Sequence, residues 1–97
     1  MATFLVVLSV KAAPEYTGNV SGFYVNNTGT ALVNLDVETP NCGNAGWPFT
    51  FSVDAPGAKE WVSMFLMARA QQSVIRVGHS ANPDGHCSIV YVHFYDF

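Results

Sequence analysis

The sequence predicts one small domain, spanning residues 1–97, that is mainly β with a single α-helix. Three observations support this prediction. The length of 97 residues is enough for one hydrophobic core. Most apolar residues lie in short segments separated by clusters of Gly, Asn and Pro, which is typical of strands and turns. Only residues 58–72 combine helical spacing of apolar side chains with helix-starting residues.

The first segment, TFLVVLSV at residues 3–10, is apolar on both alternating faces. Strands that are buried on both sides have this pattern, so we expect residues 1–13 to form an N-terminal strand. The alternative is a short secretory signal that is cleaved near Lys11. No Lys or Arg precedes the apolar segment, which favours the strand. No segment reaches the roughly 18 apolar residues that a membrane-spanning helix requires.

Residues 15–39 are predicted to form a β-hairpin. The turn NNTGT at residues 26–30 contains Asn and Gly, which tolerate positive φ. Gly22 interrupts the first arm and indicates a bulge, which small barrels need at their corners. The apolar residues of the two arms are Val20, Phe23 and Val25, then Leu32, Val33, Leu35 and Val37.

A loop at residues 40–48 leads to a short strand at 49–54 and then to the helix. Asp54 or Gly57 can cap this helix, and Pro56 suits its first turn. Its apolar stripe contains Trp61, Phe65 and Ala68.

Two more strands, at residues 73–79 and 87–97, flank a turn at 80–86. The order of four strands, one helix and two strands is typical of a small antiparallel Greek-key barrel of five or six strands. In such a barrel we expect the helix to plug the open end with Trp61 and Phe65.

The composition limits the classes of function. Only 11% of residues are charged, against about 25% in typical proteins, so part of the surface is expected to be buried against other subunits. The net charge is −3, and the four Lys and Arg residues form no cluster. Nucleic acid binding requires several cations to neutralise phosphates, so it is not expected.

Cys42 and Cys87 both lie in loop-like segments rich in Gly, Asn and Pro. Such cysteines form a disulfide readily in an oxidising compartment, and a free reactive thiol is the alternative. A disulfide between them would close a loop of about 45 residues and add roughly 4 kcal/mol of stability. It would also indicate a secreted or periplasmic protein.

The layout of residues 16–95 resembles the receptor-binding B subunits of subtilase-type and pertussis-type bacterial toxins. The shared features are a first hairpin, a Cys in the next segment, a strand leading into a helix, the strand QQSVIRV at residues 71–77 and a second Cys near the last strand. The resemblance implies an OB-like barrel that assembles into a homo-oligomeric ring, often a pentamer, and binds glycans, commonly sialylated ones. It also implies that Cys42 pairs with Cys87. The apolar segment 1–13 departs from this family.

The hairpin region contains the residue types that recognise sugars. An aromatic platform contacts the apolar face of a sugar ring, and small polar side chains bind its hydroxyl groups. The alternative is that the aromatic side chains only pack the barrel or a subunit interface. The candidate ligand-binding residues are Tyr16, Thr17, Asn19, Ser21, Tyr24 and Asn26.

No catalytic, cofactor or metal site is expected. His79, His86 and His93 are seven residues apart and could approach a metal together with Asp84 or Cys87, but they are also ordinary turn and strand residues. A Cys–His nucleophilic pair needs a third group and a cleft, which no motif marks. We therefore expect a non-enzymatic, oligomeric glycan-binding module. The alternative is a structural or inhibitory module that binds another protein.

Overall fold

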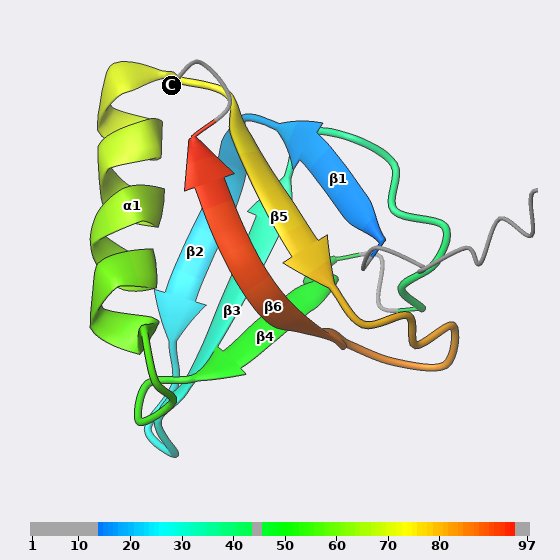
Figure 1. Ribbon diagram of the computed structural model, residues 1–97. Helices are drawn as coiled ribbons and strands as arrows, with labels where there is room; N and C mark the ends of the chain where they lie inside the picture. Colours follow the sequence, from blue (N-terminus) through cyan, green and yellow to red (C-terminus); the bar gives the residue numbers. More distant parts are fainter. Residues whose placement is uncertain (1–13, 44–45, 95–97) are drawn as a thin grey trace, which may run out of the picture.

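The computed structural model describes residues 14–43 and 46–94 (Figure 1). The expected N-terminal strand at 1–13 and the last three residues of the final strand lie outside the described residues. In chain order the elements are β1 (Glu15–Gly18), β2 (Val20–Val25), β3 (Thr30–Leu35), β4 (Phe49–Ser52), α1 (Ala58–Gln71), β5 (Ile75–His79) and β6 (Cys87–Phe94).

These strands form one mixed sheet in the order β1-β5-β6-β4-β3-β2, which is curled into a half-barrel (Figure 1). All neighbours are antiparallel except β4 and β6, where Phe49 pairs with Cys87 in parallel. The mainly β fold with one helix is confirmed, but the expected closed, wholly antiparallel barrel is wrong. The chain between β4 and β6 contains both α1 and β5, and such a long crossover lets two strands run in the same direction.

The two edge strands of the sheet, β1 and β2, are consecutive in the chain and separated only by Asn19. β1 pairs with β5, whereas β2 pairs with β3. The expected first arm of the hairpin is therefore a strand that bends at Asn19 and changes its partner. The register shift between Val20 and Gly22 confirms the bulge expected in this arm.

The hairpin of β2 and β3 is confirmed, and Asn26 organises its turn. The Asn26 Oδ1 atom accepts hydrogen bonds from the backbone N–H of Thr28 at 3.0 Å and of Thr30 at 3.0 Å. It also accepts the Thr28 hydroxyl at 2.6 Å. Gly29 follows with a φ of 79°, a conformation that glycine adopts without strain.

α1 packs beside β2 and β6, lengthwise along the curled sheet, and does not plug the end of a closed barrel (Figure 1). Gly57 at its N-cap has a φ of 81°, and Gln72 ends the helix with a φ of 54°. Phe65 and Ala68 are fully buried against the sheet. Trp61 is half-buried and meets the Phe51 ring edge-on at 5.3 Å between centroids.

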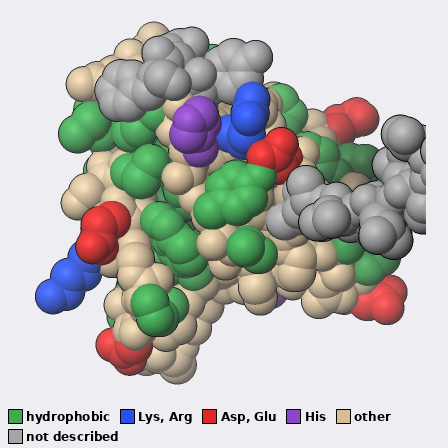
Figure 2. All heavy atoms as spheres, in the orientation of Figure 1, with side chains coloured by type: hydrophobic (Ala, Val, Ile, Leu, Met, Phe, Trp, Pro, Cys, Tyr) green, Lys and Arg blue, Asp and Glu red, His purple; other side chains and the backbone are tan. Residues whose placement is uncertain are grey.

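The core lies between the concave face of the sheet and α1. Its largest fully buried side chains include Phe49, Phe65, Ile75 and His79. On the face that carries α1 and β6, charged side chains are few and hydrophobic ones gather between uncharged polar groups (Figure 2). The large hydrophobic residues exposed among those described are Tyr24, Val25, Val37, Leu66, Met67 and Val90.

Candidate functional site

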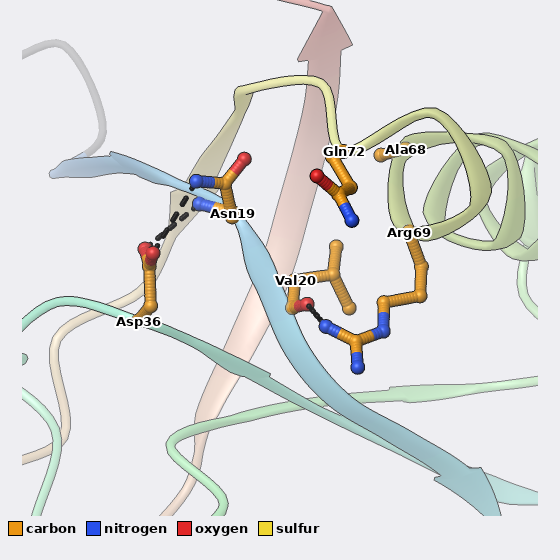
Figure 3. Close-up of a pocket in the computed structure, with 6 residues that line it drawn as sticks. All are labelled: Asn19, Val20, Asp36, Ala68, Arg69 and Gln72. Carbon is orange, nitrogen blue, oxygen red and sulfur yellow. Dashed lines mark hydrogen bonds between the residues drawn. The ribbon is translucent and has the colours of Figure 1, made fainter.

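A small pocket lies between the start of β2 and the C-terminal end of α1 (Figure 3). Its volume is about 230 Å³. We call it the polar pocket, because four of its six lining residues have polar side chains. Its lining residues are Asn19, Val20, Asp36, Ala68, Arg69 and Gln72.

Asn19 is the most constrained of these residues, because it is the bend between β1 and β2. Its backbone N–H donates to the Asp36 carboxylate at 2.8 Å, and its Nδ2 atom donates to the same carboxylate at 3.3 Å. The backbone N–H of Asp36 donates in return to the Asn19 carbonyl oxygen at 2.9 Å. These bonds hold the side chain in one orientation, with Oδ1 directed away from Asp36 (Figure 3).

The Asn19 Oδ1 atom is buried and has no hydrogen-bond partner among the described residues. Buried side-chain oxygens are nearly always paired, and one that is not usually has a role or a missing partner. In Figure 3 this oxygen lies on the side of the pocket where Gln72 lies. This oxygen is therefore an acceptor that is held in place beside the pocket and lacks a donor among the described residues.

Arg69 and Gln72 supply the donors of the pocket from the last turn of α1. An Arg69 guanidinium N–H donates to the Val20 carbonyl oxygen at 3.1 Å, which ties the helix to the edge strand β2. A guanidinium has further N–H donors, and Arg69 is exposed. The Gln72 amide both donates and accepts. The pocket can therefore bind a small neutral or anionic molecule rich in hydroxyl or carboxylate groups.

A second feature on β2 is an aromatic pair formed by Tyr24 and Trp47. The two rings meet edge-on, with centroids 4.7 Å apart. The Trp47 ring also covers the α-carbon of Gly22, where an added Cβ would lie 2.8 Å from the ring. Tyr24 is 42% exposed, so the pair presents aromatic surface to solvent.

The six residues predicted from the sequence do not form one site. Asn19 lines the polar pocket, and Tyr24 belongs to the aromatic pair. Ser21 is exposed at the bulge of β2. The other three, Tyr16, Thr17 and Asn26, have structural surroundings.

Tyr16 stacks on His79 with centroids 5.0 Å apart, and its hydroxyl accepts the backbone N–H of Asn41 at 3.1 Å. Thr17 pairs with Arg76 in the ladder of β1 and β5. Asn26 holds the hairpin turn, as described above. These contacts give the side chains of Tyr16 and Asn26 structural roles, whereas the ladder fixes only the backbone of Thr17.

Sequence reasoning missed Asp36, Arg69 and Gln72. They come from the end of β3 and the end of α1, far from Asn19 in the chain. Nothing local marks them, since an Asp after a strand and an Arg in the last turn of a helix are common. The pairing of β2 with β3 brings Asp36 to Asn19, and the packing of α1 against β2 brings Arg69 and Gln72 there.

Cys42 and Cys87 form a disulfide with a Cα–Cα distance of 5.5 Å. The disulfide ties the loop before β4 to the start of β6. The same loop is held by two N–H donations from Gly43 and Asn82, to the carbonyl oxygens of Asn82 and Asn41 respectively. The disulfide is consistent with an oxidising compartment.

No protein-family model, curated protein or solved structure matches this chain. Within the described ranges 14–43 and 46–94, no helix is long and apolar enough to cross a membrane. The geometry of the polar pocket and of the aromatic pair is therefore what indicates a function.

Proposed function

We propose that this protein is a non-enzymatic carbohydrate-binding module whose polar pocket holds a sugar ring. The observation that carries the proposal is that Asn19, which lines this pocket, has a buried side-chain oxygen without a hydrogen-bond partner among the described residues. A buried acceptor without a donor costs about 1–3 kcal/mol. A ligand hydroxyl that donates to Oδ1 removes this cost, so the free energy of binding includes it.

The other groups of the pocket suit a sugar for the same reason. Each sugar hydroxyl both donates and accepts, and the pocket offers the Asp36 carboxylate as acceptor and Arg69 as donor. The apolar side chains of Val20 and Ala68 can contact the C–H groups of a ring. The volume of about 230 Å³ lies below the range of about 300–1,000 Å³ for drug-sized ligands, so we infer that one ring is bound.

A longer glycan would extend along β2 toward the aromatic pair. Gly22, which lies under the Trp47 ring, follows Asn19 by three residues. At about 3.3 Å per strand residue the separation is about 10 Å, the scale of two linked sugar rings. Tyr24 and Trp47 would then contact the second ring.

The proposal includes assembly of the chain into a homo-oligomeric ring, often a pentamer in the toxin B subunits that it resembles. The low charged fraction of 11% and the exposed Leu66 and Val90 support this assembly. The disulfide supports a secreted or periplasmic location.

The test is a glycan array with the purified protein, followed by calorimetry on any glycan that binds. We expect Asn19→Ala and Arg69→Ala to weaken binding at least about tenfold, which corresponds to about 1.4 kcal/mol. The matched controls are Asn27→Ala in the hairpin turn and Lys59→Ala at the other end of α1. Binding by Asn19→Ala equal to wild type would remove the polar pocket as the site. A folded protein that binds no glycan would remove the function itself.

The second candidate is a structural or inhibitory module that binds another protein. The exposed Leu66, Met67 and Val90 favour it, because large apolar patches mark protein interfaces. Light scattering, which measures the oligomeric state, distinguishes the two candidate functions when it is combined with the glycan array. A ring that binds glycan supports the first candidate, whereas a monomer of 10.5 kDa without glycan binding supports the second.

A further inference from the structure

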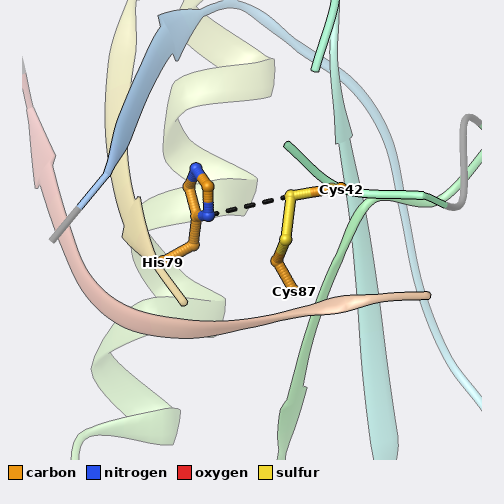
Figure 4. Close-up of side chains that lie close together, drawn as sticks. All are labelled: Cys42, His79 and Cys87. Atoms are coloured by element: carbon orange, nitrogen blue, oxygen red, sulfur yellow. Dashed lines mark hydrogen bonds between the residues drawn. A yellow bond between two sulfur atoms is a disulfide. The ribbon is translucent and has the colours of Figure 1, made fainter. Parts of the chain in front are cut away.

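Three side chains that can bind a metal ion meet at the disulfide. Cys42, His79 and Cys87 come from three separate segments, and their potential ligand atoms all lie within 4.8 Å of one another (Figure 4). All three residues are buried, with at most 4% of any of them exposed. This cluster takes no part in the proposed carbohydrate site.

The His79 ring is fixed but incompletely paired. Its Nδ1 atom lies 2.6 Å from the Ser80 carbonyl oxygen, and because a carbonyl only accepts, Nδ1 carries the proton. Its Nε2 atom is buried with no hydrogen-bond partner among the described residues. Tyr16 stacks parallel on the ring at 5.0 Å, and Phe49 packs against it at 5.3 Å. These two rings hold the imidazole beside the sulfur atoms.

One distance in this cluster already resembles that around a tetrahedral metal ion. His79 Nδ1 lies 3.7 Å from Cys42 Sγ, whereas the two sulfur atoms are bonded and must separate before a metal can bind. In a zinc site the Zn–S bond is about 2.3 Å and the Zn–N bond about 2.0–2.1 Å, so a tetrahedral angle places N and S about 3.5 Å apart. Figure 4 shows Nδ1 directed at the disulfide.

We propose that, once the disulfide is reduced, Cys42, Cys87 and His79 bind a zinc ion. A dithiol reductant transfers two electrons and two protons to the S–S bond, is itself oxidised to a disulfide, and leaves two thiols. Zinc then replaces the two thiol protons. The Nδ1 proton of His79 moves to Nε2, so the imidazole stays neutral and the net release is two protons.

The change requires a local rearrangement. The Ser80 carbonyl oxygen lies 2.6 Å from Nδ1, so this carbonyl has to turn away when a metal ion binds about 2.0–2.1 Å from the same nitrogen. Ser80 is exposed, and water can then replace the His79 donor. His79 Nε2, which has no partner among the described residues, changes from an acceptor to a donor, so this step leaves no additional buried atom of that part of the chain unsatisfied. The two sulfur atoms separate by side-chain rotation on Cα atoms that are already 5.5 Å apart.

A cavity on the surface reaches Cys42, one of the three residues of the cluster. A cavity of about 650 Å³ is lined by Cys42 and Gly43 and by the acidic residues Asp36 and Glu38. These carboxylates attract a divalent cation, and water from this cavity can fill the fourth coordination position. The same three side chains can therefore close the loop of Cys42 onto β6 by a disulfide under oxidising conditions and by zinc under reducing ones.

The experiment is a cobalt titration of the protein, reduced with a phosphine and handled without oxygen. We expect one Co²⁺ per reduced chain, with thiolate-to-cobalt charge-transfer absorption and the visible bands of a tetrahedral ion, displaced by zinc. The oxidised protein should show neither. Cys42→Ser leaves one thiolate, so it should weaken both the charge-transfer band and the binding of cobalt. His79→Gln removes a direct ligand and should weaken cobalt binding by at least about 100-fold, since loss of a residue that only supports a ligand costs about 10–100-fold. The matched control, His93→Gln on the exposed part of β6, should bind as wild type.

Reduced wild-type protein without the cobalt spectrum would overturn the proposal. Equally tight cobalt binding by His79→Gln and the wild type would also overturn the proposal, because the two thiolates alone would then account for the binding. If His79→Gln does not fold, nitrogen NMR of His79 in the wild-type protein decides. A shift at Nδ1 on addition of zinc supports the site, and an unchanged imidazole overturns it. None of these outcomes depends on glycan binding.

Discussion

The Tyr91 ring lies against the α-carbon of Gly78, its cross-strand partner on β5, in the space that any side chain at residue 78 would fill. A Cβ built on Gly78 overlaps the ring atoms of Tyr91. The register shift next to this pair, between Gly78 and His79, bends β5 where it carries His79 to the disulfide. The glycine and the aromatic ring therefore set the path of β5 at the buried cluster.

We predict that Gly78→Ala destabilises the protein by about 1–3 kcal/mol, the usual cost of overpacking. Urea denaturation followed by circular dichroism measures this. Gly85→Ala is the comparison, because its Cβ would lie 3.2 Å from the Asn82 amide nitrogen, a much milder contact than the overlap with the Tyr91 ring at Gly78, and we expect a loss of less than about 1 kcal/mol. Combining Gly78→Ala with Tyr91→Ala should recover part of the loss. Equal stability of Gly78→Ala and wild type would contradict the packing described here.

Removal of the disulfide has a separate expected effect. We predict that Cys42→Ser combined with Cys87→Ser lowers the free energy of unfolding by about 2–5 kcal/mol, because the unfolded chain regains the freedom of a 45-residue loop. Denaturation of the oxidised protein and the double variant measures the difference. Zinc should raise the midpoint for the reduced wild type but not for the double variant. An unchanged midpoint for the double variant would show that backbone bonds alone hold this loop.

The contact between Arg69 and Val20 predicts a modest loss of stability alongside the loss of ligand binding. Arg69→Ala removes the hydrogen bond to the Val20 carbonyl oxygen, which is worth about 1 kcal/mol. Lys59→Ala removes the same charge from the first turn of α1 and should change stability by less than about 0.5 kcal/mol. Thermal melts of the two variants provide the comparison. A larger loss of stability for Lys59→Ala than for Arg69→Ala would mean that the positive charge on α1, and not the hydrogen bond to Val20, stabilises the protein.

Phe65 lies on the buried face of α1. It is fully buried and stacks near Phe23, with ring centroids 5.8 Å apart. Phe65→Ala should cost about 3–5 kcal/mol through lost burial and a cavity. The neighbouring Leu66 is 54% exposed, so Leu66→Ala should cost far less in a monomer. Denaturation of both variants checks the orientation of the helix, and similar losses would contradict it. A large loss for Leu66→Ala that depends on protein concentration would indicate that Leu66 lies in a subunit interface.

The candidate site was only partly accessible to sequence reasoning. Asn19 and Tyr24 stood out because small polar and aromatic residues in a hairpin suit a sugar. Tyr16 met the same criterion, yet the structure stacks it on His79 beside the disulfide. Composition reports which chemical groups are present but not which of them share a cavity. Arg69 could not be found this way, because its position depends on how a helix docks on a distant strand.

By itself the sequence determined the local elements of this protein. Alternating apolar residues specify the strands, the Asn and Gly residues of 26–29 specify the hairpin turn, and spacing specifies the helix to within one residue at its end. These features depend on neighbours in the chain. Only the tertiary structure decided the parallel pairing of β4 with β6, the half-barrel, the polar pocket and the buried His79 beside the disulfide. Each of these depends on how distant segments pack to bury apolar surface, and several arrangements of the same elements satisfy the local preferences equally well.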